Sequence, residues 1–143
     1  MSGERELAGR LDDLFQKISA FTLRQKNQFA EETGVSRQQL EVLDIIYTKG
    51  QLTMGELCRE ISSACSTATD LADKLEKAGY AERAREKKDR RVVRLRILPQ
   101  GEELIKSIKE KRIQALVAEL EGLGQNEGRK AVEFLEELFA RLK

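Results

Sequence analysis

Hydrophobic residues near the start of the chain recur with the period of an α-helix. The recurring positions are Leu7, Leu11, Leu14, Phe15 and Ile18. Spacings of three and four residues place side chains on one face, so this segment is predicted to form an amphipathic helix. We expect the helix to continue past Phe29 and to end near Gly34, because glycine is favoured just beyond a helix C-terminus.

Two later segments carry a paired signal for the start of a helix. Ser36 is followed three residues later by glutamine, and Thr53 is followed three residues later by glutamate. This is the spacing of a capping box, in which each of the two side chains accepts a hydrogen bond from a free backbone N–H group. The first helix is expected to end at Gly50, and the second is expected to be short and to end near Ile61.

A further helix is predicted over residues 63–78, with Ser62 or Ser63 as its N-cap and Gly79 beyond its end. One arc of this helix is apolar and consists of Ala64, Ala68, Leu71, Ala72 and Leu75. The opposite arc is charged or hydroxylated and begins with small side chains. We therefore expect the apolar arc to face the core and the other arc to face solvent.

An alternating pattern replaces the helical period in the next part of the chain. Residues 81–86 and 92–97 are predicted to form two short strands, and Val93, Leu95 and Ile97 share one face of the second strand. The sequence KKDRR lies at the turn between them. These features predict a β-hairpin with basic residues around its tip.

The remainder of the chain is predicted to be helical. Pro99 suits the first turn of a helix, and the apolar pattern carries that helix to about Leu120. The stretch GLGQNEG is expected to break it. A last helix is predicted to contain Val132, Leu135, Leu138, Phe139 and Leu142. The order of elements therefore indicates a mainly α fold with a small β-hairpin.

Charge is distributed unevenly, although the chain of 143 residues carries a formal net charge of only +1. Residues 83–96 contain eight basic and two acidic residues, a net charge of +6, which leaves −5 for the remainder. A basic element on an acidic body concentrates positive potential, and a polyanion is its natural partner. A short helix, a second helix and a basic hairpin in this order predict a winged helix–turn–helix domain over residues 35–99.

In such a domain the helix over residues 63–78 is the recognition helix, and the hairpin over residues 83–96 is the wing. Small outward side chains allow a helix to enter the DNA major groove, about 12 Å wide, and to reach base edges. The tip of the wing then reaches the neighbouring minor groove, where a narrow groove deepens the negative potential and attracts arginine. The sequence therefore predicts a protein that binds double-stranded DNA.

Three stretches carry a resemblance to a known family. QLTMGEL, STATDLADKLEKAGYAER and KKDRRVVRLRILPQGEEL resemble the MarR family (multiple antibiotic resistance regulators), closely over residues 40–104 and by pattern alone elsewhere. The resemblance implies a homodimer on a pseudo-palindromic operator, with residues 1–34 and 100–143 as the helical dimerisation region. It also implies that Arg91 enters the minor groove and that Asp89 orients it.

Members of this family typically act as repressors, and many release DNA on binding a small aromatic or phenolic molecule. The resemblance thus implies a ligand-responsive repressor with a small apolar or phenolic effector. The expected DNA contacts are Ser66, Thr67, Thr69, Asp70, Lys74, Arg85, Lys87, Lys88, Asp89, Arg90 and Arg91. The expected dimer contacts are Leu7, Leu11, Leu14, Phe15, Ile18, Leu135, Leu138, Phe139 and Leu142.

Asp70 departs from the family pattern, which usually has a basic residue at this position of the recognition helix. A carboxylate there repels phosphate. It can accept a hydrogen bond from cytosine N4 in the major groove, or it can pair with Lys74 one turn later. We favour the pair with Lys74.

Several features also have other interpretations. The basic run can be a solvated hairpin, and Arg94 and Arg96 can serve only to keep the outer face of their strand soluble. Winged domains also mediate protein–protein assembly, for which an apolar outer face on the recognition helix is expected. Cys65 lies in the first turn of that helix, where the dipole favours a thiolate, so a redox-responsive regulator is a further alternative. Cys58 is expected to point inward as a core residue.

The composition argues against catalysis and against a cofactor. The chain has no histidine, which excludes a histidine-based catalytic triad and a histidine-ligated metal. Its two cysteines, seven residues apart, do not match a zinc site, and no glycine-rich phosphate loop is present. No apolar stretch approaches the length of about eighteen residues typical of a membrane span, and the charged start does not resemble a signal peptide. We therefore expect a cytoplasmic location.

Overall fold

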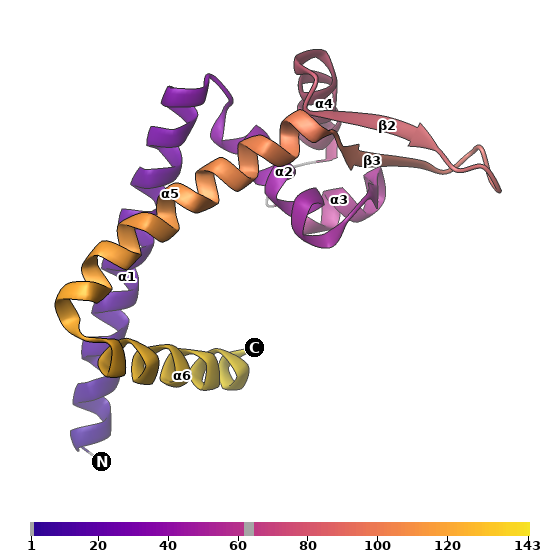
Figure 1. The fold of residues 1–143 in the computed structure, drawn as a ribbon. Coiled ribbons are helices and arrows are strands. Elements are labelled where there is room, and N and C mark those ends of the chain that lie inside the picture. The colour runs from indigo at the N-terminus through magenta and orange to yellow at the C-terminus, as the bar shows by residue number, and fades with distance from the viewer. Residues whose placement is uncertain (1, 62–64) are drawn as a thin grey trace. The chain divides into compact units, whose positions relative to one another are not determined.

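The computed structural model describes residues 2–61 and 65–143. Its elements are α1 (Ser2–Thr33), α2 (Arg37–Lys49), β1 (Leu52–Thr53), α3 (Met54–Glu60), α4 (Cys65–Ala78), β2 (Ala81–Arg85), β3 (Val93–Ile97), α5 (Pro99–Leu123) and α6 (Gln125–Leu142) (Figure 1). The mainly helical architecture with a small antiparallel sheet confirms the predicted fold class. The chain divides into two compact units, Met1–Ile105 and Lys106–Lys143.

The predicted starts and ends of the first helices are confirmed. Gly34, just after α1, has a φ of +73°, a left-handed conformation that glycine adopts without strain. At α2 the Ser36 hydroxyl accepts from the Gln39 N–H at 3.1 Å, and the Gln39 side chain accepts from the Ser36 N–H at 2.8 Å. At α3 Thr53 and Glu56 form the same reciprocal pair. Both capping boxes therefore satisfy backbone donors that a helix start leaves free.

The core of the first unit is built where α2, α3, α4 and β3 meet. Its fully buried side chains include Val42, Leu43, Ile46, Leu57, Ala68, Ala72, Leu75 and Leu95. The two alanines bring α4 close to its neighbours, because a small side chain lets two backbones approach. This packing fixes α4 on one side and leaves its opposite side exposed.

Within the described residues α4 spans Cys65–Ala78, and its end agrees with the predicted range of 63–78. The proposed N-cap residues Ser62 and Ser63 lie outside the described residues, as does Ala64 of the predicted apolar arc. The other four members of that arc are buried as predicted; they are Ala68, Leu71, Ala72 and Leu75.

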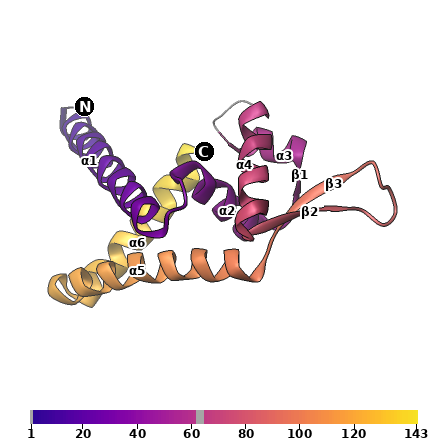
Figure 2. The same ribbon diagram turned by 90° about the horizontal axis from the view of Figure 1, so that it is seen from above.

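The sheet has one strand more than the two that were predicted. β2 and β3 form the expected hairpin, each one residue shorter than predicted, and the sheet order is β1-β3-β2. β1 is only two residues long and pairs with β3 through Leu52↔Leu95 and Thr53↔Arg94. So short a strand has no alternating pattern that the sequence could reveal. Figure 1 shows the hairpin extending beyond the helices of its unit, and Figure 2 shows α4 lying across its base.

The two C-terminal helices were predicted correctly, but the position and length of the break between them were predicted wrongly. α5 extends to Leu123, and α6 begins at Gln125, so Gly124 alone separates them. Gly124 has a φ of +98°, whereas Gly122 and Gly128 lie within the helices. A glycine inside a helix lowers stability by only about 1 kcal/mol relative to alanine. A stretch with three glycines can therefore remain largely helical and need not form a long linker. No helix in residues 2–61 and 65–143 combines the length and apolarity that crossing a membrane requires.

Gly101 is required by the close approach of α5 to the end of α4. A Cβ atom at this position would clash with the backbone carbonyl oxygen of Tyr80 and would lie 2.9 Å from Cγ1 of Ile97. The same Tyr80 carbonyl accepts a hydrogen bond from the Leu98 N–H at 2.9 Å. Because the clash is with backbone, a side-chain rotation cannot relieve it.

We predict that Gly101→Ala lowers the free energy of unfolding by about 1–3 kcal/mol, the usual cost of overpacking. Gly122→Ala is the matched control, because a Cβ atom at Gly122 in the same helix would meet no heavy atom of the described residues within 4 Å. That control is expected to be neutral or slightly stabilising. Urea unfolding of both variants measures the difference, and equal stability would contradict the tight contact.

Candidate nucleic-acid interface

The outward face of α4 is exposed and carries small polar side chains near its start. Ser66 and Thr69 are exposed and Thr67 is half-buried. Further along, Lys74 Nζ lies 3.0 Å from Asp70 Oδ2, and both side chains are more than half exposed. The favoured interpretation of Asp70, a pair with Lys74, is therefore what the structure contains. The pair leaves this part of the face without net charge.

Arg83 connects α4 to the base of the wing. From β2 its Nη1 donates to Asp73 Oδ1 at 2.7 Å and to Glu76 Oε1 at 2.6 Å. Its Nη2 donates to the backbone carbonyl of Thr69 at 3.2 Å. Partial burial alone would lower the pKa of Arg83, but Asp73 and Glu76 more than offset this and raise it. Arg83 is thus held along successive turns of α4 by charge-assisted hydrogen bonds.

The two outward arginines of β3 are also engaged by carboxylates. Arg94 Nε donates to Glu86 Oε1 at 2.7 Å, and its Nη1 lies 3.9 Å from Oε1 of Glu56, the capping residue of α3. Arg96 pairs with Glu82, its partner across the β2–β3 ladder. These carboxylates neutralise the positive charge of the two arginines at the base of the wing. Arg94 and Arg96 therefore form ion pairs on the outer face of the sheet. This agrees with the interpretation that they only keep that face soluble.

The turn of the hairpin is organised around Asp89. Its Oδ1 accepts from the backbone N–H of Arg91 at 3.1 Å and from Nε of Arg91 at 3.1 Å, and its Oδ2 accepts from Nη2 at 3.4 Å. These hydrogen bonds lower the pKa of Asp89, which favours its charged form. The Arg91 side chain is nevertheless 92% exposed. The arginine is oriented by its neighbour while it remains open to a partner.

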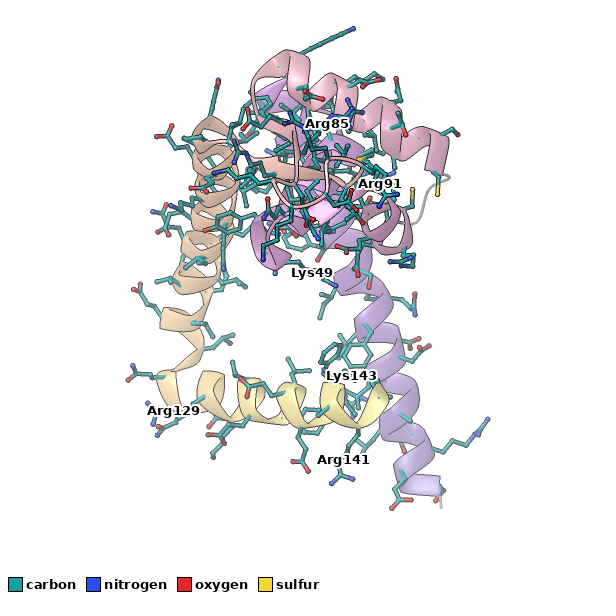
Figure 3. All side chains as sticks on the ribbon, turned by 90° about the vertical axis from the view of Figure 1, so that its right-hand side faces the viewer. Lys49, Arg85, Arg91, Arg129, Arg141 and Lys143 are labelled. Carbon is teal, nitrogen blue, oxygen red and sulfur yellow. The ribbon has the colours of Figure 1, made fainter. Side chains whose placement is uncertain are left out.

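The remaining bases gather at the tip of the wing. Arg85 donates to the backbone carbonyl of Arg90 at 2.7 Å and thereby holds the two sides of the turn together. Lys87, Lys88 and Arg90 are exposed, and none has a carboxylate partner within the described part of the chain. Figure 3 views the hairpin from its tip and labels Arg85 and Arg91 there. The positive charge predicted for residues 83–96 is therefore concentrated over residues 85–91.

Sequence reasoning missed the ion pairs that neutralise the base of the wing. The count of acids was confined to residues 83–96, whereas most carboxylates that pair with its arginines lie outside this segment. They are Glu56, Asp73, Glu76 and Glu82. Asp73 and Glu76 are three residues apart on one helix, which is a signal for a shared basic partner.

The two cysteines lie near each other at the junction of α3 and α4. Cys58 is half-buried rather than fully inward-facing, although its neighbours Leu57 and Ile61 are buried. Cys65 is exposed. The neighbouring Cys65 thiol, together with burial, raises the pKa of the Cys58 thiol. Cys58 is therefore not the simple core residue that was expected.

Comparison with known proteins agrees with this arrangement. The model of the MarR family matches residues 35–93. The uncharacterized HTH-type transcriptional regulator YsmB of Bacillus subtilis is 33% identical over 106 residues, which cover 74% of this chain and 73% of that protein. YsmB is described as a regulator and not as an enzyme, in agreement with the absence of catalysis predicted from the sequence.

Two solved structures extend the similarity over nearly the whole chain. A MarR family protein from Bacillus stearothermophilus superposes with a TM-score of 0.86 at 32% identity and covers 97% of this chain and 96% of that one. NadR in complex with 4-hydroxyphenylacetate gives a TM-score of 0.69 at 26% identity and covers 91% of this chain and 89% of that one. The chain therefore belongs to the MarR family of helix–turn–helix transcriptional regulators.

Proposed function

We propose that the protein is a homodimeric repressor that binds a pseudo-palindromic operator and releases it on binding a small ligand. The observation that carries the proposal is an exposed, unneutralised cationic wing tip attached to a helix with an exposed, small polar face. Residues 35–99 would form the DNA-binding domain, and residues 1–34 and 100–143 would form the dimerisation region. The operator lies on the chromosome, so this proposal includes a cytoplasmic location.

The polar face of α4 has the properties needed for the major groove. Ser66, Thr67 and Thr69 are short enough to let the helix approach base edges, and each hydroxyl can donate or accept. Asp70 and Lys74 neutralise each other in the free protein, and both are exposed enough to separate when DNA arrives. Within α4 as described, this face carries no apolar patch, which argues against the alternative of a protein-interaction module.

The wing tip supplies the second contact. Arg91 is long, exposed and oriented by Asp89, so its guanidinium is prepared for insertion into a narrow minor groove. Lys87, Lys88 and Arg90 surround it with flexible cations that suit phosphates. In this arrangement Arg91 contributes sequence preference, and its neighbours contribute general affinity.

Dimerisation would cover apolar side chains that the single chain leaves exposed. Neither α1 nor α6 contains a buried residue, and large hydrophobic side chains are exposed along both. Those among the predicted dimer contacts are Leu7, Leu14, Ile18, Leu135, Phe139 and Leu142, whereas Leu11, Phe15 and Leu138 are half-buried. Exposed patches of this extent are typical of interaction sites. A second copy is the occupant that two operator half-sites about 34–36 Å apart require.

Repression and ligand response follow from the same arrangement. A dimer seated on two half-sites occupies DNA that a polymerase needs, so binding near a promoter blocks transcription. NadR, at 26% identity, was solved with 4-hydroxyphenylacetate, a small phenolic carboxylate. We infer an effector of the same class, which would act by favouring a dimer geometry unable to span the operator.

Selection of bound duplexes from a random pool tests the proposal directly. The purified protein is expected to enrich an inverted repeat whose half-sites are one helical turn apart. Sequencing of captured genomic fragments would then give the natural operator. Recovery of duplexes without any common sequence would contradict specific operator binding.

We predict that Arg91→Ala weakens binding to the selected operator by about 1–3 kcal/mol, the value of a specific base-edge contact. Lys87→Ala is the matched control at the same tip. It is expected to weaken all duplexes alike and to reduce the salt slope of log K by about 0.9. Titrations at several salt concentrations separate the two effects, and unchanged operator affinity for Arg91→Ala would refute the wing-tip role.

Arg83 is proposed to act indirectly, by holding the wing in register with α4. We predict that Arg83→Ala lowers the free energy of unfolding by about 1 kcal/mol, because its two ion pairs are only partly exposed. It should also weaken operator binding without changing the salt slope. The control Lys74→Ala removes a more exposed pair on the same helix and should change stability by less than about 0.5 kcal/mol. Equal effects of the two variants on stability would contradict the special role of Arg83.

We predict a solution mass of twice the 16.3 kDa chain by sedimentation equilibrium. Phe139→Asp should shift the mass toward the monomer, because it places a charge on the apolar face of α6. Lys130→Glu introduces an acid on the opposite face of the same helix and should leave the dimer intact. A monomeric wild-type protein at micromolar concentration would refute the dimer.

A further inference from the structure

The carboxylate of Asp70 lies where neither packing nor stability explains an acidic residue. It is on the exposed side of α4, away from the buried arc, and its side chain is 59% exposed. The other two acids of that helix, Asp73 and Glu76, bind Arg83 and so hold the wing. Asp70 pairs instead with Lys74, and an exposed pair of this kind adds little to stability. The pair is therefore not explained by the fold of the free protein.

The polar groups on this side of α4 differ in what they offer to DNA. Thr69 donates its hydroxyl to the backbone carbonyl of Cys65 at 3.3 Å, so that hydroxyl offers DNA only its lone pairs. Ser66 offers a neutral hydroxyl one turn before Asp70. Asp70 and Lys74 carry full charges, and charge-assisted hydrogen bonds are roughly twice as strong as neutral ones. The pair is therefore better suited than the hydroxyls to discriminate between bases.

We propose that Asp70 and Lys74 act together to recognise a single C·G base pair in the major groove of each operator half-site. Asp70 accepts a hydrogen bond from the cytosine N4 amino group, and Lys74 donates to guanine O6. Asp70 is then a specificity-determining residue of the recognition helix. This inference rests on the proposed function, in which α4 enters the major groove.

The distance between the two charges fits the edge of a C·G base pair. Lys74 Nζ lies 3.0 Å from Asp70 Oδ2. Cytosine N4 donates to guanine O6 within the base pair, so those two atoms lie about 2.9 Å apart. N4 keeps its second proton for the groove, and O6 keeps a lone pair. The four groups therefore close a ring of hydrogen bonds, and the ion pair stays intact although its exposure would let it separate.

The atoms beside this edge disfavour the other three base pairs. On C·G the carboxylate lies beside the C5–H group of cytosine, and the ammonium lies beside guanine N7, a second acceptor. On A·T, with Asp70 over adenine, the carboxylate would meet the lone pair of N7 and the ammonium would meet the thymine methyl group. On G·C or T·A, with Asp70 over the first base, the carboxylate would face an acceptor oxygen. Only C·G is complementary to both charges.

Repeating the selection from random duplexes with the full-length variant Asp70→Asn tests this inference. The wild-type protein should enrich an inverted repeat with C·G at one position of each half-site. Asparagine accepts from adenine N6 and donates to N7, so the variant should select A·T at the same two symmetric positions and no other change. Asp44→Asn is the matched control, because it removes an exposed carboxylate from α2 and should leave the selected sequence unchanged.

Titrations on two duplexes measure the size of the effect. One duplex is the selected operator, and the other has T·A in place of C·G at the two symmetric positions. The wild-type protein should bind the second at least about tenfold more weakly, the usual effect of a mismatched base pair. Asp70→Ala should bind both alike, and Lys74→Ala should show a smaller ratio than the wild type because guanine loses its donor. An unchanged ratio in Lys74→Ala would overturn the part assigned to Lys74.

The outcomes separate this inference from the proposed function. If the wild-type protein selects an operator and Asp70→Asn selects the same one, Asp70 does not recognise a base and only the inference fails. A marked loss of stability on urea unfolding of Asp70→Asn would also overturn it, because Asp70 would then have a structural role. If the wild-type protein enriches no common sequence, the proposed function fails and the inference fails with it.

Discussion

The burial of one arc of α4 is the constraint on which the rest of the structure depends. Ala68, Leu71, Ala72 and Leu75 are at most 4% exposed, and together they press the helix against α2 and α3. With one face committed to the core, the opposite face has a fixed direction. The hairpin base is then attached to that same helix by Arg83. The candidate DNA interface is therefore specified by apolar packing first and by polar contacts second.

The arginines of the hairpin fall into two groups, one neutralised by carboxylates and one exposed at the turn. Those at the base of the wing, such as Arg83 and Arg96, are neutralised by carboxylates of α4 and β2 respectively and stabilise the sheet. Those around Arg91 project from the turn, where Asp89 is the single opposing carboxylate among the described residues. A protein with almost no net charge can thus carry a strongly positive potential at the tip of its wing. The small formal net charge conceals this, because charge matters at the distance of the Debye length, about 8–10 Å, and not over the whole chain.

Local signals in the sequence were sufficient for most of the fold. Capping boxes at Ser36 and Thr53 act within one turn of helix, so their residues determine the outcome wherever the segment lies. The same holds for the Asp89–Arg91 contact within the turn. Predictions failed where the outcome depended on contacts distant in sequence. β1 exists because β3 passes beside it, and the attachment of Arg83 to α4 appears only once the hairpin is folded back. The helix break shows a different limit, because each glycine of GLGQNEG is only weakly unfavourable in a helix and composition alone does not select Gly124.

The capping residue Glu56 also joins the helix–turn–helix to the wing. One of its oxygens accepts from the Thr53 N–H at the start of α3, and the other approaches Arg94 on β3. Thr53 itself is also paired with Arg94 in the sheet. The wing and the helix–turn–helix therefore share the contacts of Glu56, and we expect them to move as one rigid body. In the proposed homodimer, a ligand would therefore act by changing the separation of the two winged domains, because this shared contact resists bending within either domain.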